Sequence, residues 1–220
     1  MVTFQRARSE EQREIRRRAI LDAAVAMLGE MPVAEITLNE LSRRAGLAKS
    51  NVLRYFDSRE AVLLDVLERA CRDWLEALRP SLAIIRGTVV ARREALAVVL
   101  ASSLAARPVL CDLLGAQAAV LERNVSPEVA AHFKRCLLEL GGLFASEIVG
   151  VLPELGAEKT ERFVAASMIF TGAAWSFCQP SAAMLAAYEA HPELAALRMD
   201  VETTLRDVFA TLLAGLHARP

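Results

Sequence analysis

Residues 37–56 read TLNELSRRAGLAKSNVLRYF, and their spacing predicts two short helices joined by a tight turn. Thr37 and Glu40 form a capping box, in which the hydroxyl accepts from an early backbone N–H and the carboxylate reaches back. Gly46 stands where the first helix must end, because glycine tolerates the left-handed backbone of a helix C-terminus. The second helix is predicted over Lys49–Tyr55. Its predicted apolar anchors are Val52, Leu53 and Phe56.

Two short helices with a glycine in the turn between them form a helix-turn-helix. The second helix of such a motif is short enough to enter the major groove of DNA. An ordinary helical hairpin inside an all-α core has the same spacing, so spacing alone leaves both interpretations open. The identities of the residues around the turn favour the first.

The run AGLAKSNVLRYFDSREAVLLDVL, residues 45–67, resembles the DNA-binding end of the TetR family of bacterial transcriptional regulators. The matching positions are Ala45, Gly46, Tyr55, Phe56, Ser58, Glu60, Leu63 and Leu64. The chain departs from the family pattern at Ala48, where a capping Ser or Thr is usual, and at Leu53, where Tyr is common. The second departure removes a phosphate contact that the family pattern implies.

Composition predicts an all-α fold, because Ala and Leu dominate and β-branched and aromatic residues are few in the 220-residue chain. The four cysteines are far apart and form no CxxC pair, so neither a disulfide framework nor a metal site is expected. We interpret them as buried thiols of a reducing compartment and leave a redox-sensing role open.

Charge is distributed unevenly along the chain. Residues 1–59 hold eleven Lys and Arg against eight Asp and Glu, and the remainder holds fifteen against nineteen. This balance suits a front part that meets phosphate. The longest uncharged run, Phe163–Tyr188, is interrupted at Gln179–Ser181, so a buried helix is predicted there rather than a membrane span. We expect a cytoplasmic protein with no membrane partner.

The predicted fold class is an N-terminal three-helix head, residues 1–66, with its helix-turn-helix at about 37–56, followed by a larger helical body, residues 67–220. Residues Met1–Glu11 are predicted to form a loose arm before the first helix. By resemblance, the body implies ligand binding and dimerisation. The helices predicted outside the motif are Gln12–Gly29, Asp57 to about Pro80, Arg92–Ala106, Val109–Arg123, Pro127 towards Val149, Glu158–Cys178, Ser181–Tyr188 and Asp200–His217.

The resemblance assigns DNA contacts residue by residue. Lys49, Ser50 and Asn51 lead the recognition helix and are the candidates for base contact, since Asn pairs with adenine and Lys with guanine. Further implied contacts to bases or phosphates are Thr37, Asn39, Arg54, Tyr55 and Arg59. Arg16 and Arg17 are added because cations in the first turns of a helix oppose its dipole unless a phosphate favours them. A solvated charged face is the alternative for these two.

A homodimer is expected, because one recognition helix contacts too few bases and two copies read both halves of a palindrome. The predicted helix over Phe163–Cys178 is apolar nearly all round, which indicates burial on two sides. A central helix of a monomeric core is the alternative. The expected interface residues are Phe163, Ala166, Ile169, Phe170, Ala173, Leu205, Phe209 and Leu212.

The resemblance also implies a pocket in the body for a small hydrophobic effector. Its candidate lining residues, each of which is alternatively plain core, are Trp74, Leu78, Phe133, Phe144, Phe170 and Trp175. The expected function is a repressor released from palindromic double-stranded DNA by that effector. An activator of the same family and a helical interaction protein that has lost DNA binding remain open.

An enzyme is not expected. The chain holds no HExxH, Walker or Rossmann pattern, and its histidines, His132, His191 and His217, are scattered. We therefore expect no catalytic residue, no cofactor and no metal ion.

Overall fold

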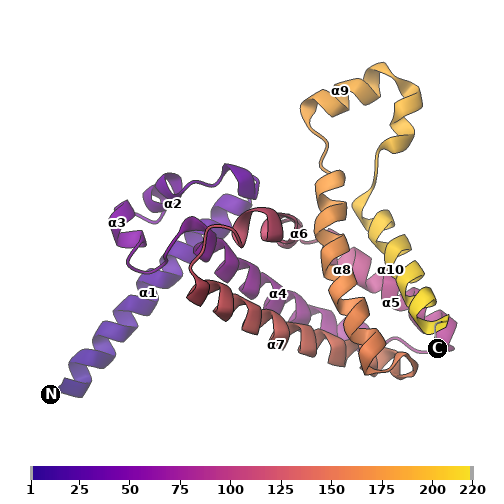
Figure 1. Cartoon of the computed structure of the whole chain (residues 1–220), viewed down its shortest axis with the longest axis horizontal. Coiled ribbons are helices and arrows are strands. Elements are labelled where there is room, and N and C mark those ends of the chain that lie inside the picture. Colours follow the sequence, from indigo (N-terminus) through magenta and orange to yellow (C-terminus); the bar gives the residue numbers. More distant parts are fainter. Residues whose placement is uncertain (1, 219–220) are drawn as a thin grey trace. The chain divides into compact units, whose positions relative to one another are not determined.

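The computed structural model describes residues 2–218, with side chains from residue 11 onward, and every regular element in that range is helical (Figure 1). The all-α prediction is confirmed. The α-helices are α1 Val2–Leu28, α2 Leu38–Arg44, α3 Lys49–Val52, α4 Arg59–Ala83, α5 Val89–Ala105, α6 Pro108–Ala116, α7 Pro127–Val151, α8 Ala157–Phe177, α9 Ala182–Ala190 and α10 Val201–Ala218. Short 3-10 or π-helical turns are η1 Val33–Glu35, η2 Gln117–Leu121, η3 Pro153–Leu155 and η4 Pro192–Leu197.

Two predictions for residues 1–66 are wrong. The loose arm predicted over Met1–Glu11 is part of α1, which starts at Val2; Met1 lies outside the described residues. Residues 3–14 contain neither Gly nor Pro and are rich in Arg, Glu and Gln, which favour a helix. The recognition helix α3 ends at Val52 rather than Tyr55, and turns carry the chain onward to Phe56.

The chain forms two compact units. The first comprises Met1–Arg69 and Ala116–Arg135, and the second comprises Ala70–Gly115 and Cys136–Pro220. Helices α4 and α7 each contribute one end to the first unit and the other end to the second.

The core of the first unit is built on one face of α1. Ile20, Ala24 and Met27 recur at helical spacing and are fully buried. The same unit buries one apolar side chain from α2, Leu41, and one from α3, Val52. Helices α1, α2 and α3 contact one another in sequence, so the short α3 is placed by tertiary packing (Figure 1).

In the second unit, α10 packs against both α5 and α8. The rings of Phe163 on α8 and Phe209 on α10 meet edge to face with centroids 6.0 Å apart. A second aromatic pair joins Trp74 and Phe144, with centroids 5.0 Å apart. Each pair adds about 0.5–1.5 kcal/mol to the burial of its area.

Helices α6 and α8 cross with their backbones in close approach at two glycines. A Cβ added at Gly172 would lie 2.7 Å from the carbonyl carbon of Leu114 and 2.8 Å from the amide nitrogen of Gly115. Both neighbours are backbone atoms, which cannot rotate aside as a side chain can. The crossing therefore requires glycine at position 172.

Among the described residues, no single helix combines the length and apolar composition needed to span a bilayer. Val89–Ala105 and Pro108–Leu121 meet the two criteria only when taken together, and they are bent by 89° at the break between them.

We predict that Gly172→Ala lowers the free energy of unfolding by about 2 kcal/mol, because the added methyl forces two backbones apart. The matched control is Gly142→Ala on α7, where an added Cβ meets nothing within 4 Å. There alanine should leave stability unchanged or raise it by about 0.5–1 kcal/mol. Urea unfolding followed by circular dichroism measures both. Equal effects in the two variants would contradict the close crossing.

Candidate nucleic-acid interface

The turn between α2 and α3 ends the first helix with a complete set of backbone hydrogen bonds. Gly46 has φ +65° and directly follows the last turn of α2. The Leu47 amide donates to the Ser42 carbonyl at 3.0 Å, and the Gly46 amide donates to the Arg43 carbonyl at 3.2 Å. This is a Schellman motif, which satisfies the carbonyls that a helix end leaves unpaired. The predicted role of Gly46 is confirmed.

The Thr37 half of the predicted capping box is present at the start of α2, and the Glu40 carboxylate binds arginines. The Thr37 hydroxyl oxygen accepts from the Glu40 amide at 3.2 Å and keeps its own proton for a further acceptor. The Glu40 carboxylate accepts from the Arg43 and Arg44 side chains. These hydrogen bonds, chiefly that from Arg43, lower the pKa of Glu40 to about 2. Arg44 also pairs with Glu30 at 2.6 Å. Arg43 and Arg44 are thus engaged on the head itself.

The recognition helix α3 is a single turn, and buried apolar side chains fix it to the head. Val52 is completely buried and Phe56, after the helix, is nearly so. Ala48 at the N-cap makes no side-chain cap bond, which confirms the loss expected from its methyl side chain. Because four residues cannot sustain a helix alone, α3 depends on these two anchors.

The outer face of α3 is exposed. Lys49 and Ser50 on α3 are exposed, as is Arg54 in the turn after it, and Leu53 at the end of the helix is 43% exposed. The prediction that Leu53 anchors the helix is therefore wrong. Its position follows Lys49 by four residues, which places it on the same outward face, while Val52 takes the inward one. Asn51 and Tyr55 are half-buried at the border.

The Arg17 side chain makes contacts within the head. Its guanidinium forms an ion pair with Asp65, donates to the Tyr55 carbonyl at 3.4 Å and lies 4.4 Å from the centroid of the Phe56 ring. Burial raises the pKa of Asp65 above its ordinary value, although the Arg17 cation acts in the opposite direction. Arg17 therefore joins α1 to the end of the recognition segment and to α4, which accounts for its position without a phosphate. Arg16, its neighbour, is exposed.

Arg59 is likewise engaged within the head. Its Nη1 donates to the Ile36 carbonyl at 2.6 Å, and its Nη2 pairs with Glu60 at 2.8 Å. The exposed members of the predicted set, which remain open to a ligand, are Arg16, Thr37, Asn39, Lys49, Ser50 and Arg54. All six belong to the first unit.

One contact of the first unit joins residues far apart in the sequence, so no local pattern predicts it. The Ser126 hydroxyl accepts from the Val129 amide at 3.3 Å, as the predicted cap of α7, and also donates to Asp57 at 2.9 Å. Asp57 directly follows the recognition segment and lies 69 residues earlier in the chain. The start of α7 is thereby tied to the turn that leads into α4.

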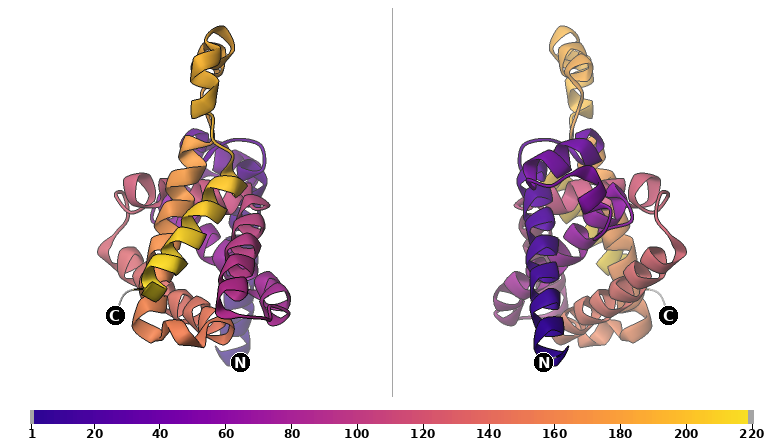
Figure 2. Two further views of the ribbon diagram at one scale, coloured as in Figure 1. Left: turned by 90° about the vertical axis from the view of Figure 1, so that its right-hand side faces the viewer. Right: turned by 90° about the vertical axis from the view of Figure 1, so that its left-hand side faces the viewer.

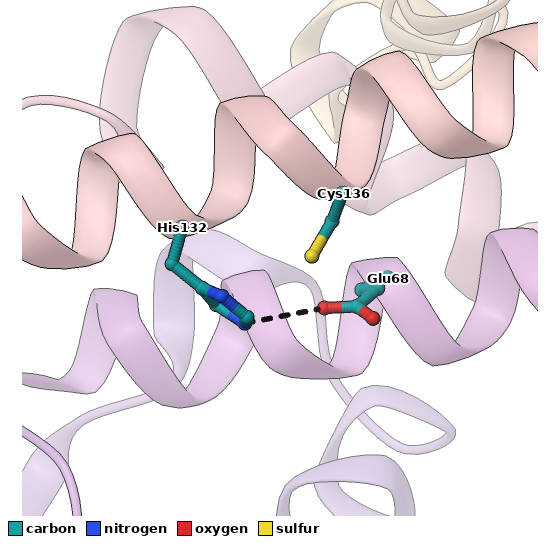
Figure 3. Close-up of side chains that lie close together, drawn as sticks. All are labelled: Glu68, His132 and Cys136. Carbon is teal, nitrogen blue, oxygen red and sulfur yellow. Dashed lines mark ion pairs between the residues drawn. The ribbon is translucent and has the colours of Figure 1, made fainter.

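A carboxylate and an imidazole also meet in this unit. Oε2 of Glu68 on α4 lies 3.9 Å from Nε2 of His132 on α7 (Figure 3). Carboxylates and imidazoles are groups that ligate metal ions. The expectation that the chain binds no metal ion therefore stays a prediction.

The predicted pocket residues do not all belong to the same unit. Phe133 belongs to the first unit and the other five to the second. Trp74 and Phe144 are buried against each other, and the Trp74 indole N–H donates to the Ser103 hydroxyl at 3.0 Å. Leu78 is buried and Trp175 half-buried. Phe170 is 44% exposed.

The predicted dimer residues divide into buried and exposed groups. Phe163, Leu205 and Phe209 are completely buried inside their own unit, so the expectation that they face a partner is wrong. They fill the contact between α8 and α10, whose apolar faces the sequence pattern did not assign to one another. Ile169, Phe170 and Ala173 are exposed, and Ala166 and Leu212 are half-buried.

Comparison with known families matches both parts of the chain. Residues 68–220 match the family described as tetracyclin repressor-like, C-terminal domain, and residues 20–66 match bacterial regulatory proteins, tetR family. The HTH-type transcriptional regulator EthR of Mycobacterium tuberculosis is 41% identical over 51 residues, or 23% of this chain and 24% of that protein. The chain thus aligns with about a quarter of the length of that relative.

Solved structures share the fold over nearly the whole chain. A TetR transcriptional regulator from Rhodococcus sp. RHA1 has a TM-score of 0.57 at 13% identity, covering 94% of this chain and 97% of that one. FadR from Bacillus subtilis, solved in complex with stearoyl-CoA, has a TM-score of 0.55 at 13% identity, covering 90% and 97%. At these identities the likeness shows the fold alone.

We predict that Arg17→Met lowers the free energy of unfolding at pH 7 by about 2 kcal/mol, because it leaves the Asp65 carboxylate partly buried without its cation. The loss should shrink as pH falls through the raised pKa of Asp65, since protonation removes the unpaired charge. Adding Asp65→Asn should restore most of the stability and, if Arg17 acts only within the head, the DNA affinity as well. Restored stability with lost DNA affinity would show that Arg17 contacts DNA directly.

Proposed function

Because the chain belongs to the TetR family of bacterial transcriptional regulators, which bind DNA, we propose that it is a dimeric repressor released from a palindromic operator by a small hydrophobic effector. Residues 1–66 serve as the DNA-binding head and residues 67–220 as the regulatory and dimerisation body in this proposal.

The outward face of α3 carries the proposal. Lys49 and Ser50 are solvent-exposed on a turn of helix whose opposite side is fixed by Val52, and Arg54 is exposed in the turn that follows it. A short rigid helix with free polar side chains suits the major groove, where Lys reads guanine and Asn reads adenine. We assign base contact to Lys49, Ser50 and Asn51.

Phosphate contact is assigned to groups around that face. Arg54 and Arg16 are exposed cations, and the Thr37 hydroxyl has a proton to donate at the start of α2. Asn39 and Tyr55 complete the set by resemblance to the family pattern. Arg17 and Arg59 support the head rather than meet the duplex, since each already binds groups of the head. Such contacts set orientation, whereas base edges set specificity.

Dimerisation is supported by the exposed apolar face of α8. Ile169 is 73% exposed and Phe170 is 44% exposed, with the exposed Ala173 beside them on the helix. Exposed apolar residues at consecutive helical positions favour a partner. A two-fold pair would present two copies of α3 to the two halves of a palindrome.

The effector proposal rests on the apolar interior of the body and on family resemblance. Trp74, Leu78 and Phe144 give that interior large apolar side chains with few charged groups. A ligand releases DNA only if it binds the non-binding arrangement of the protein more tightly. FadR with its acyl-CoA suggests the first probe to use.

We predict that Asn51→Ala weakens operator binding by about 1–3 kcal/mol through the loss of a base contact. Arg54→Ala should lower the slope of log affinity against log salt by about two, one phosphate contact for each protomer. Fluorescence anisotropy of labelled DNA from upstream of the gene, over a salt series, measures both effects.

The control for Arg54→Ala is Arg162→Ala, which removes the same charge from α8 in the second unit. It should leave the salt slope unchanged. If Arg54→Ala and Asn51→Ala both keep wild-type affinity while helicity and dimerisation are intact, the outward face of α3 is not the DNA-reading surface.

We predict that stearoyl-CoA lowers operator affinity at least tenfold, while coenzyme A alone has no effect, because the acyl chain supplies the apolar contact. Binding should also change the fluorescence of Trp74 and Trp175, the only two tryptophans, both in the second unit. Unchanged operator affinity at saturating stearoyl-CoA would exclude long-chain acyl thioesters as effectors.

A further inference from the structure

We propose that the segment Gln179–Asp200, which we call the arm, docks on α8 of a second copy of this chain. The proposal rests on the proposed dimer and names the segment of the partner that covers the exposed face of α8. The arm connects α8 to α10 and contains α9 and η4.

The arm stands away from the helices it connects. No side chain of α9 or of η4 is buried, although both lie in the well-packed second unit. Figures 1 and 2 show α9 and the turns after it projecting beyond the ends of α8 and α10 in every view. The arm therefore adds nothing to the core of its own protomer.

Its composition is that of a covered segment rather than of a solvated loop. Residues 179–200 read QPSAAMLAAYEAHPELAALRMD, with only four charged side chains in twenty-two. Met184 is 46% exposed, Leu197 65% and Met199 43%. Solvent-facing connections are usually polar. A covering partner explains the apolar composition of the arm.

The uncovered apolar surface continues along α8 up to the point where the arm begins. Ile169, Ala173 and Phe177 follow one another at four-residue spacing, so they line one face of α8. Ile169 is 73% exposed and Phe177 is 75% exposed. The exposed face of α8 and the arm thus adjoin in the chain and share the same character.

The amount of uncovered apolar surface suits a second copy. Exposed fractions of this size on six large side chains correspond to roughly 700 Å², taking about 200 Å² for each when fully exposed. A stable interface buries about 800 Å² on each partner. The six are Ile169, Phe170, Phe177, Met184, Leu197 and Met199. In a two-fold pair each arm covers the partner's α8, so one symmetric contact buries both surfaces of both copies.

The charge of the arm also favours α8 of a second copy as its partner. The arm holds Glu189, Glu193 and Asp200 against Arg198 and is net acidic, so it repels nucleic acid and anionic membranes. It should not pair with the identical arm, which carries the same charge. The stretch of α8 from Phe163 to Phe177 contains no charged residue and offers an apolar surface without repulsion.

Site-specific photo-crosslinking of the full-length protein tests the contact. With p-benzoylphenylalanine in place of Leu197, irradiation of the purified protein should give a covalent dimer on a denaturing gel. Peptide mapping should locate the link on α8 of the other copy. The matched control places the same residue at Leu138 on α7, which is 78% exposed and outside the proposed interface. It should give no dimer band.

Light scattering on the same samples separates the two proposals. A dimer in solution with no crosslink from position 197, or with a link only within one chain, overturns the arm contact and leaves the proposed dimer intact. A monomer in solution at micromolar concentration overturns both.

Substitution provides a second readout that does not need the crosslinker. Leu197→Glu should raise the dissociation constant of the dimer at least tenfold in sedimentation, because it places a charge in an apolar contact, while helicity stays unchanged. Leu138→Glu should leave it unchanged. A dissociation constant unaltered by Leu197→Glu counts against the arm.

Discussion

The burial of Val52 and Phe56 is the constraint on which the recognition surface depends. Helix α3 has four residues and no side-chain cap, so its conformation comes from what lies beneath it and from the turn before it. The positive φ of Gly46 and the two hydrogen bonds of the Schellman motif fix how the chain enters α3. Arg17 then fixes how it leaves, by binding Asp65 and the Tyr55 carbonyl. A rigid outward face follows from these inward contacts.

The cations of the head fall into two groups, those bound within the head and those exposed to solvent. Arg17, Arg43, Arg44 and Arg59 all bind carboxylates or carbonyls of the head, while Lys49 and Arg54 are exposed on the outward face. A modest excess of positive charge is therefore concentrated near the candidate base contacts. This favours a short set of directed contacts over a broad basic surface.

Local signals in the sequence predict their structural roles correctly, because their partners lie within a few residues. Thr37, Gly46 and Ser126 each act where the sequence predicts. Roles that depend on distant partners carry no such local signal. Arg17 meets Asp65, and Ser126 meets Asp57, only after the chain has folded. Phe163 and Phe209 were expected at a partner for the same reason: an apolar stripe does not state which neighbour covers it. The pocket, the interface and the domain limits remain predictions.

Hydrogen exchange of the full chain, free and with operator DNA, tests the central claim most directly. The account predicts slower exchange in the segment from Thr37 to Phe56 when DNA is bound, with no change in the arm. Protection confined to other segments, or no protection with DNA bound, would contradict an outward-facing recognition helix held in place by Val52 and Phe56.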